Sequence, residues 1–157
     1  MDCNTDNQGC SQGNMDNAYT YIIHNQGLAT EDDYPYTGSQ GWCNEDVPKT
    51  VTIAGFQDVP SMDEDALMQA VSQQPVTTYV ECQNPDFKNY GGGVFTGACG
   101  QDVNHAFTII GYDTDLEGDF WIAKNSWGVN WGEEGYMRIA RNINACGLAE
   151  NPSFPTQ

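Results

Sequence analysis

The sequence predicts an α+β fold in which a helical, loop-rich first part is followed by a β-rich second part. Two segments carry apolar residues at helical spacing, and both lie before Pro75. After Pro75, runs of β-branched and aromatic residues alternate with Gly and Asp turns, which is typical of short strands. At 157 residues the chain is long enough to bury a substantial core.

The predicted elements follow in order along the chain. Residues 1–14 are polar and form a predicted loop, and a helix begins at Met15 and stops at Gly27. Residues 28–49 are rich in turn residues and predict an extended segment. The stretch from Ser61 to Glu64 has the spacing of a capping box and predicts a second helix to about Ser72. Strands are predicted at 51–56, 76–81, 106–112, 120–124 and 136–141.

The charge of the chain excludes some classes of partner. Five Lys and Arg against 22 Asp and Glu give a formal net charge of −17, which repels phosphate backbones, so we expect no nucleic-acid partner. No apolar run is long enough to cross a bilayer, so no membrane role is expected.

Six cysteines lie far apart, without a CxxC pair, and only two histidines accompany them. Zinc sites need clustered ligands, so we expect no metal and no other cofactor. Widely spaced cysteines favour disulfides and an oxidising compartment, with a pairing that spacing alone does not give. The six are Cys3, Cys10, Cys43, Cys82, Cys99 and Cys146.

Three residues of the β-rich part could act together chemically. His105 opens a predicted strand, and Asn125 and Trp127 stand in a Gly- and Trp-rich stretch. A catalytic imidazole must be held in one tautomer, which an amide oxygen can do, and an indole can shield that bond from water. A lone His at a strand edge is more often structural, and a Trp-rich stretch is more often core, so both alternatives stand beside the catalytic one.

The chain resembles the papain-like cysteine peptidases of the cathepsin L and papain type over nearly its whole length. The most specific match is Lys124 to Tyr136, which reads KNSWGxxWGxxGY. Other matching stretches, in the same order as in the family, are Asp2-Cys3, Gly9-Cys10, Tyr34-Pro35-Tyr36, Gln74-Pro75-Val76, Tyr90 to Phe95, Val103 to Ala106, Gly111-Tyr112, Cys146 to Ala149 and Ser153-Phe154-Pro155.

The resemblance implies a two-domain fold and gives three residues a role. Residues 1–49 would be a remnant of the helical domain, and residues 50–157 would form the β-rich, barrel-like antiparallel domain. His105 would be the general base, Asn125 its orienting partner and Trp127 the shielding indole. The peptide-binding cleft would take Gly13, Asn14, Met15, Tyr79, Val103, Asn104 and Asn151, although Met15 and Tyr79 are equally compatible with core packing.

The family's nucleophile signature, C-G-[SA]-C-[WY], is absent from the sequence. The usual spacing to His105 places that cysteine roughly 25 residues before Met1. The Gln that helps to form the oxyanion hole is absent as well. The stretch before Cys10 superficially resembles the residues before the nucleophile, but it matches a later segment of the family better.

The resemblance also implies a disulfide pattern. Cys3 would pair with Cys43, and Cys99 with Cys146. Cys10 would pair with a cysteine of the absent segment and is expected to be free here. Cys82 has no counterpart in the family and is expected to be a free, small buried side chain in a strand.

We therefore expect a cysteine-type endopeptidase whose 157 residues are inactive alone because the catalytic Cys lies upstream of Met1. The alternative is a non-catalytic homologue that binds peptides or inhibitors. Expected partners are peptide or protein substrates and cystatin-like inhibitors, with a monomer if the protein is complete. Disulfide use and resemblance imply a secreted, lysosomal or vacuolar location.

Overall fold

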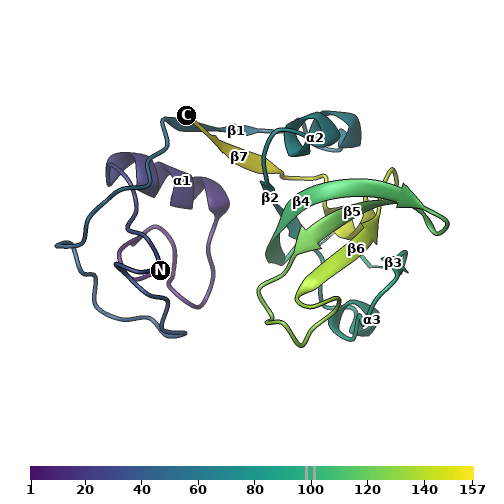
Figure 1. Ribbon diagram of the computed structural model, residues 1–157, viewed down its shortest axis with the longest axis horizontal. Helices are drawn as coiled ribbons and strands as arrows, with labels where there is room; N and C mark the ends of the chain where they lie inside the picture. The colour runs from purple at the N-terminus through teal and green to yellow at the C-terminus, as the bar shows by residue number, and fades with distance from the viewer. Residues whose placement is uncertain (98, 101) are drawn as a thin grey trace. The chain divides into compact units, whose positions relative to one another are not determined.

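The computed structural model describes residues 1–97, 99–100 and 102–157. These residues form two compact units (Figure 1). The first unit consists of Met1–Gln57 and Pro155–Gln157, and the second of Asp58–Phe154. The first holds one helix among loops and the second holds most of the strands, so the predicted α+β class is confirmed.

The first unit is built around α1 (Met15–His24). The Asn14 side chain caps this helix by accepting hydrogen bonds from the backbone N–H groups of Asp16 and Asn17. Tyr19, on the buried face of α1, stacks on Phe56 with ring centroids 5.5 Å apart. The predicted stop at Gly27 is confirmed: its φ is +126°, and an added Cβ would lie 2.9 Å from the Val51 carbonyl oxygen.

The strand predicted at 51–56 is displaced in the structure. Val51 forms only an isolated bridge with Leu28, and β1 spans Gly55–Asp58. The reason is the partner: the Ala54 N–H donates to the Thr156 carbonyl oxygen, which places the following residues beside β7 (Ser153–Thr156). β7 was not predicted, because Pro155 interrupts its strand pattern.

The described strands follow the order β1-β7-β2-β4-β5-β6-β3. In the second unit, β4 pairs antiparallel with β2 and β5, and β5 pairs antiparallel with β6, as the central ribbons of Figure 1 show. The short β3 differs because it pairs parallel with β6. The bounds are β2 Val76–Val80, β3 Val94–Phe95, β4 His105–Asp115, β5 Gly118–Lys124 and β6 Tyr136–Ala140.

The core of the second unit is formed by residues of its strands together with residues of α2 (Glu64–Val71) and α3 (Pro85–Lys88). Leu67 and Val71 of α2 are buried in this core. The largest side chains that are fully buried there are Trp121, Phe87, Leu67, Ile109, Met137, Ile139 and Leu148. Burial of these apolar groups is what holds the strands that carry the candidate site.

The predicted capping box at Ser61 is wrong. The cap of α2 is Asp63, whose side chain accepts the Ala66 N–H at 2.8 Å. Met62 has a left-handed φ of +63° and donates its N–H to the Ala149 carbonyl oxygen, so the chain turns into the helix only at Asp63. Three further elements were not predicted: the short helix α3 (Pro85–Lys88), the two-residue strand β3 and the 3-10 turn at Ala145–Gly147.

Candidate active site

His105 and Asn125 are brought together by two adjacent strands of the second unit. His105 is the first residue of β4, and Asn125 directly follows β5, the strand that pairs with β4. The His105 Nε2 atom lies 2.8 Å from the Asn125 Oδ1 atom. The Asn125 backbone N–H donates to the Gly135 carbonyl oxygen at 3.0 Å, and the residue is 7% exposed.

A backbone group fixes the direction of this hydrogen bond. The Ser126 N–H lies 2.7 Å from the same Asn125 side-chain atom, and an N–H donor needs an acceptor, so this atom is the amide oxygen. The His105 Nε2 atom must therefore carry the proton that it donates to Asn125. Nδ1 is then the unprotonated nitrogen of the neutral ring, and no described residue forms a hydrogen bond with it.

Trp127 covers the imidazole. The rings of Trp127 and His105 lie 4.9 Å apart between centroids and are tilted by 37°. Phe87 of α3 and Trp131 also pack against Trp127, each in an edge-to-face contact, with ring centroids 5.9 and 5.1 Å from that of Trp127. Phe87 is fully buried, and Trp131 donates its indole N–H to the Lys88 carbonyl oxygen at 3.0 Å.

The supporting role of Phe87 was not predicted from the sequence. The signal was present in Asn84-Pro85-Asp86, because the Asn84 side chain accepts the Asp86 N–H and Pro occupies the first turn of α3. A helix of four residues is too short to show periodicity, so the pattern of apolar residues could not reveal it.

The predicted cleft residues of the second unit come from β2, from the segment before β4 and from the segment before β7. Tyr79 stands opposite Ala106 in the β2–β4 pair, Val103 is half-buried, and Asn151 is exposed. The Asn104 side chain is already engaged, since its Oδ1 accepts from the Cys82 N–H and its Nδ2 donates to the Asp102 carbonyl oxygen.

The predicted cleft residues of the first unit are consecutive. Gly13 lies against the Asn7 side chain, Asn14 caps α1, and Met15 is the half-buried first residue of that helix. Cys10 is an exposed free thiol of the same unit.

The structure forms the two disulfides that the resemblance implies, Cys3–Cys43 and Cys99–Cys146. Cys82 is free, as expected, but it is half-buried and lies beyond the end of β2. β2 ends before Cys82 because the Glu81 N–H donates to the Cys146 carbonyl oxygen and not to a neighbouring strand. Burial is the main cause that raises the pKa of the Cys82 thiol above its ordinary value, with the nearby Glu81 charge adding to it.

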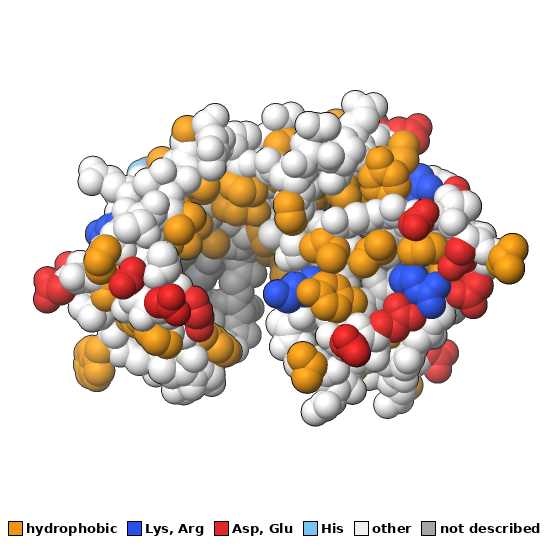
Figure 2. All heavy atoms as spheres, viewed as in Figure 1, with side chains coloured by type: hydrophobic (Ala, Val, Ile, Leu, Met, Phe, Trp, Pro, Cys, Tyr) orange, Lys and Arg blue, Asp and Glu red, His pale blue; other side chains and the backbone are white. Residues whose placement is uncertain are grey.

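In the right-hand part of Figure 2, acidic side chains lie beside some of the Lys and Arg side chains. Among the described residues no group of three or more His, Cys, Asp or Glu is arranged to hold a metal ion. The helices in the described part of the chain are too short or too polar to cross a bilayer.

A family model described as "Papain family cysteine protease" matches residues 1–156. The chain is 46% identical to the oryzain beta chain of Oryza sativa, 45% to the cysteine proteinase COT44 of Brassica napus and 44% to zingipain-2 of Zingiber officinale. It is covered in full in these matches but spans only 35%, 50% and 73% of the respective relatives.

Two solved structures show the same fold. The bromelain protease from Ananas comosus, in complex with the inhibitor E-64, matches with a TM-score of 0.94 and 43% identity over 99% of this chain and 74% of that chain. The proform of a ragweed pollen cysteine protease matches with a TM-score of 0.95 and 41% identity over 99% of this chain and 44% of that one.

Proposed function

Because the chain belongs to the papain family of cysteine proteases, we propose that its β-rich unit supplies the base half of a site that hydrolyses peptide bonds. His105 is the general base, Asn125 orients it and Trp127 shields their hydrogen bond from water. The observation that carries this proposal is the 2.8 Å contact from His105 Nε2 to Asn125 Oδ1, because it leaves Nδ1 to exchange protons with a nucleophile.

In the proposed reaction a cysteine thiolate, paired with the His105 imidazolium, attacks the peptide carbonyl carbon and forms a tetrahedral oxyanion. His105 gives its Nδ1 proton to the leaving nitrogen as the C–N bond breaks, which leaves a thioester. A water molecule then loses a proton to Nδ1 and attacks the thioester carbonyl. The C–S bond breaks, the acid is released, and the thiolate–imidazolium pair is restored.

We propose that the thiolate comes from a segment outside these 157 residues, so that the chain alone has no peptidase activity. The C-G-[SA]-C-[WY] signature does not occur in the sequence, and Cys3, Cys43, Cys99 and Cys146 form disulfides. The Cys82 thiol has a raised pKa and lies within hydrogen-bonding distance of Asn104, so it is a poor nucleophile.

The proposed substrates are extended peptides or proteins, and cystatin-like inhibitors are proposed partners. Tyr79, Val103 and Asn151 are the proposed lining on the second unit, and Gly13 and Met15 on the first. Asn14 and Asn104 are proposed to belong to the same lining. The side chain and the backbone N–H of each already form hydrogen bonds within the chain. The disulfides support a secreted, lysosomal or vacuolar location.

A peptidase assay on the 157-residue chain and on His105→Ala, each with and without a thiol reductant, tests these roles. We expect no hydrolysis above the buffer rate from either protein. Thiol-dependent hydrolysis that His105→Ala abolishes would refute the external nucleophile while keeping His105 as the base. Hydrolysis that survives in His105→Ala would refute the role of His105.

A further inference from the structure

Asn125 and Trp127 belong to one loop, residues 125–135, which joins β5 to β6 and is called here the active-site loop. Its ends are tied together, because the Asn125 N–H donates to the Gly135 carbonyl oxygen. Within it, the Gly135 N–H donates to the Trp131 carbonyl oxygen at 2.7 Å. The place of Asn125 therefore depends on the place of Gly135.

The turn before β6 holds Gly135 in an uncommon conformation. Glu134 has a φ of +56° although it is not glycine, and Gly135 follows with +92°. A left-handed non-glycine residue costs free energy locally, so contacts elsewhere must hold this turn. Glu133 and Tyr136 close it with two backbone hydrogen bonds, at 2.9 and 3.0 Å.

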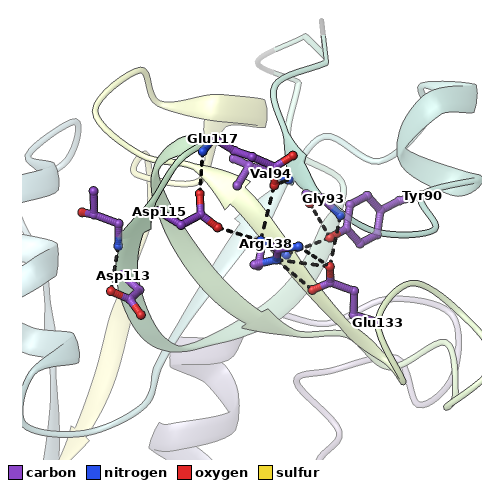
Figure 3. A network of polar contacts seen from close by, with 9 residues as sticks. Tyr90, Gly93, Val94, Asp113, Asp115, Glu117, Glu133 and Arg138 are labelled. Carbon is purple, nitrogen blue, oxygen red and sulfur yellow. Dashed lines mark hydrogen bonds and ion pairs between the residues drawn. The ribbon is translucent and has the colours of Figure 1, made fainter.

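The Glu133 side chain attaches this turn to the sheet (Figure 3). Its carboxylate accepts from the Arg138 Nε atom at 3.1 Å and from Nη2 at 2.8 Å, a two-pronged ion pair with a residue of β6. The same carboxylate accepts the Gly93 N–H at 3.1 Å. The active-site loop is thus fastened to β6 and to the segment before β3.

Arg138 is itself fixed from several sides. Its Nη1 atom contacts the carboxylates of Asp115 at 3.0 Å and Glu117 at 3.4 Å, and its guanidinium lies 5.4 Å from the centre of the Phe120 ring. Its backbone N–H donates to the Tyr90 hydroxyl, which donates to the Gly93 carbonyl oxygen. The Arg138 hydrogen bond is the main cause that lowers the pKa of Glu133 below its ordinary value.

We propose that Glu133 is a positioning residue of the peptidase site, which acts through Arg138 to hold Asn125 and Trp127 of the active-site loop against His105. The inference rests on the proposed roles of these three residues. Glu133 touches none of the reacting atoms. Its removal should therefore loosen the hydrogen bond between His105 and Asn125 while the sheet core stays formed.

Nitrogen NMR of the imidazoles in the 157-residue chain tests this directly. The chain has two histidines, so His24, on the first unit, serves as an internal reference for His105. The variants are Glu133→Gln, which removes the charge, and Arg138→Lys, which keeps the charge and removes the two-pronged geometry. Glu134→Gln is the matched control, because its exposed carboxylate has the same chemistry one residue away.

In the unmodified chain we expect His105 with its proton on Nε2 and slow exchange of that proton with water. Glu133→Gln and Arg138→Lys should speed this exchange by roughly tenfold, the scale of one lost charge-assisted bond. Exchange of the Trp127 indole proton should also become faster in these two variants, while the backbone amides of Ile109 and Ala123 in the core stay protected from exchange. Glu134→Gln should match the unmodified chain.

Three results would overturn the inference. One is unchanged His105 exchange in both variants. Another is an equal increase at Ile109, Ala123 and His105, which would make the ion pair a general stabiliser of the unit. The third is loss of the fold in both variants, which would also make the ion pair a general stabiliser of the unit. None of these results depends on whether the complete protein is a peptidase, because no readout uses activity.

Discussion

The Glu64→Gln substitution should strongly destabilise the unit that carries the candidate site. The Glu64 carboxylate accepts three N–H groups from distant parts of the chain. One oxygen takes the Trp121 indole N–H and the Asn142 backbone N–H, both at 2.8 Å, and the other takes the Asn144 backbone N–H at 2.6 Å. Asn142 and Asn144 both have left-handed φ values, so this carboxylate holds a turn that is unfavourable locally.

The size of the loss in unfolding free energy follows from the number of N–H donors that the Glu64 side chain binds. A Gln side chain has one oxygen and one NH₂ group, so at least one of the three N–H groups would face another donor. The loss of one hydrogen bond to a charged group, together with an unsatisfied N–H, costs roughly 3 kcal/mol. For a unit of about a hundred residues this lowers the melting temperature by roughly 12–24 °C.

Thermal unfolding followed by far-UV circular dichroism, with the disulfides intact, measures this effect. Asp65→Asn is the control, because Asp65 is an exposed carboxylate in the same helical turn and should lose less than about 1 kcal/mol. If the melting temperature fell no further in Glu64→Gln than in Asp65→Asn, the three hydrogen bonds would not hold the turn at residues 142–144.

Three further predictions concern other parts of the molecule. Phe87→Ala removes a fully buried ring and should cost about 3–5 kcal/mol in denaturant unfolding, so a loss below about 2 kcal/mol would contradict its place in the aromatic cluster. Alkylation followed by mass spectrometry at neutral pH should modify the exposed Cys10 before Cys82, whose pKa is raised by burial, and the reverse order would contradict the structure. The hydrogen bond from the Gly41 N–H lowers the pKa of Asp2. The stabilisation that this contact gives is therefore complete above the ordinary Asp pKa of about 3.9, and it is lost as the pH falls through the lower pKa of the native state. NMR of the Asp2 carboxyl group should find a titration midpoint below about 3.9, and a midpoint above that value would contradict the contact.

Local sequence patterns predicted the longer elements and missed the short ones. The helix from Met15 was found because its apolar face and the stop at Gly27 are local signals. The strand near residue 51 was misplaced because β1 is selected by its partner β7, which no local pattern shows. The helical cap was assigned to Ser61 instead of Asp63, because the φ of Met62 depends on a hydrogen bond to Ala149.

The same distinction holds for the candidate site. The motif around Asn125 and Trp127 named the residues that the structure places against His105. Their supports were not predicted, since the contacts of Phe87 with Trp127 and of Glu133 with Arg138 exist only after the sheet has formed. Sequence motifs identify the groups that do chemistry, whereas the groups that hold them in place appear from the fold.

The central claim is that this chain carries the base half of a cysteine peptidase site. The most direct test is the intact mass of the natural protein, isolated from its tissue, after treatment with an irreversible epoxide inhibitor of cysteine peptidases. We predict a single adduct on a polypeptide longer than 157 residues, with the label on a cysteine outside the sequence described here. A polypeptide that begins at Met1 and takes up no inhibitor would contradict the claim and favour a homologue that only binds peptides.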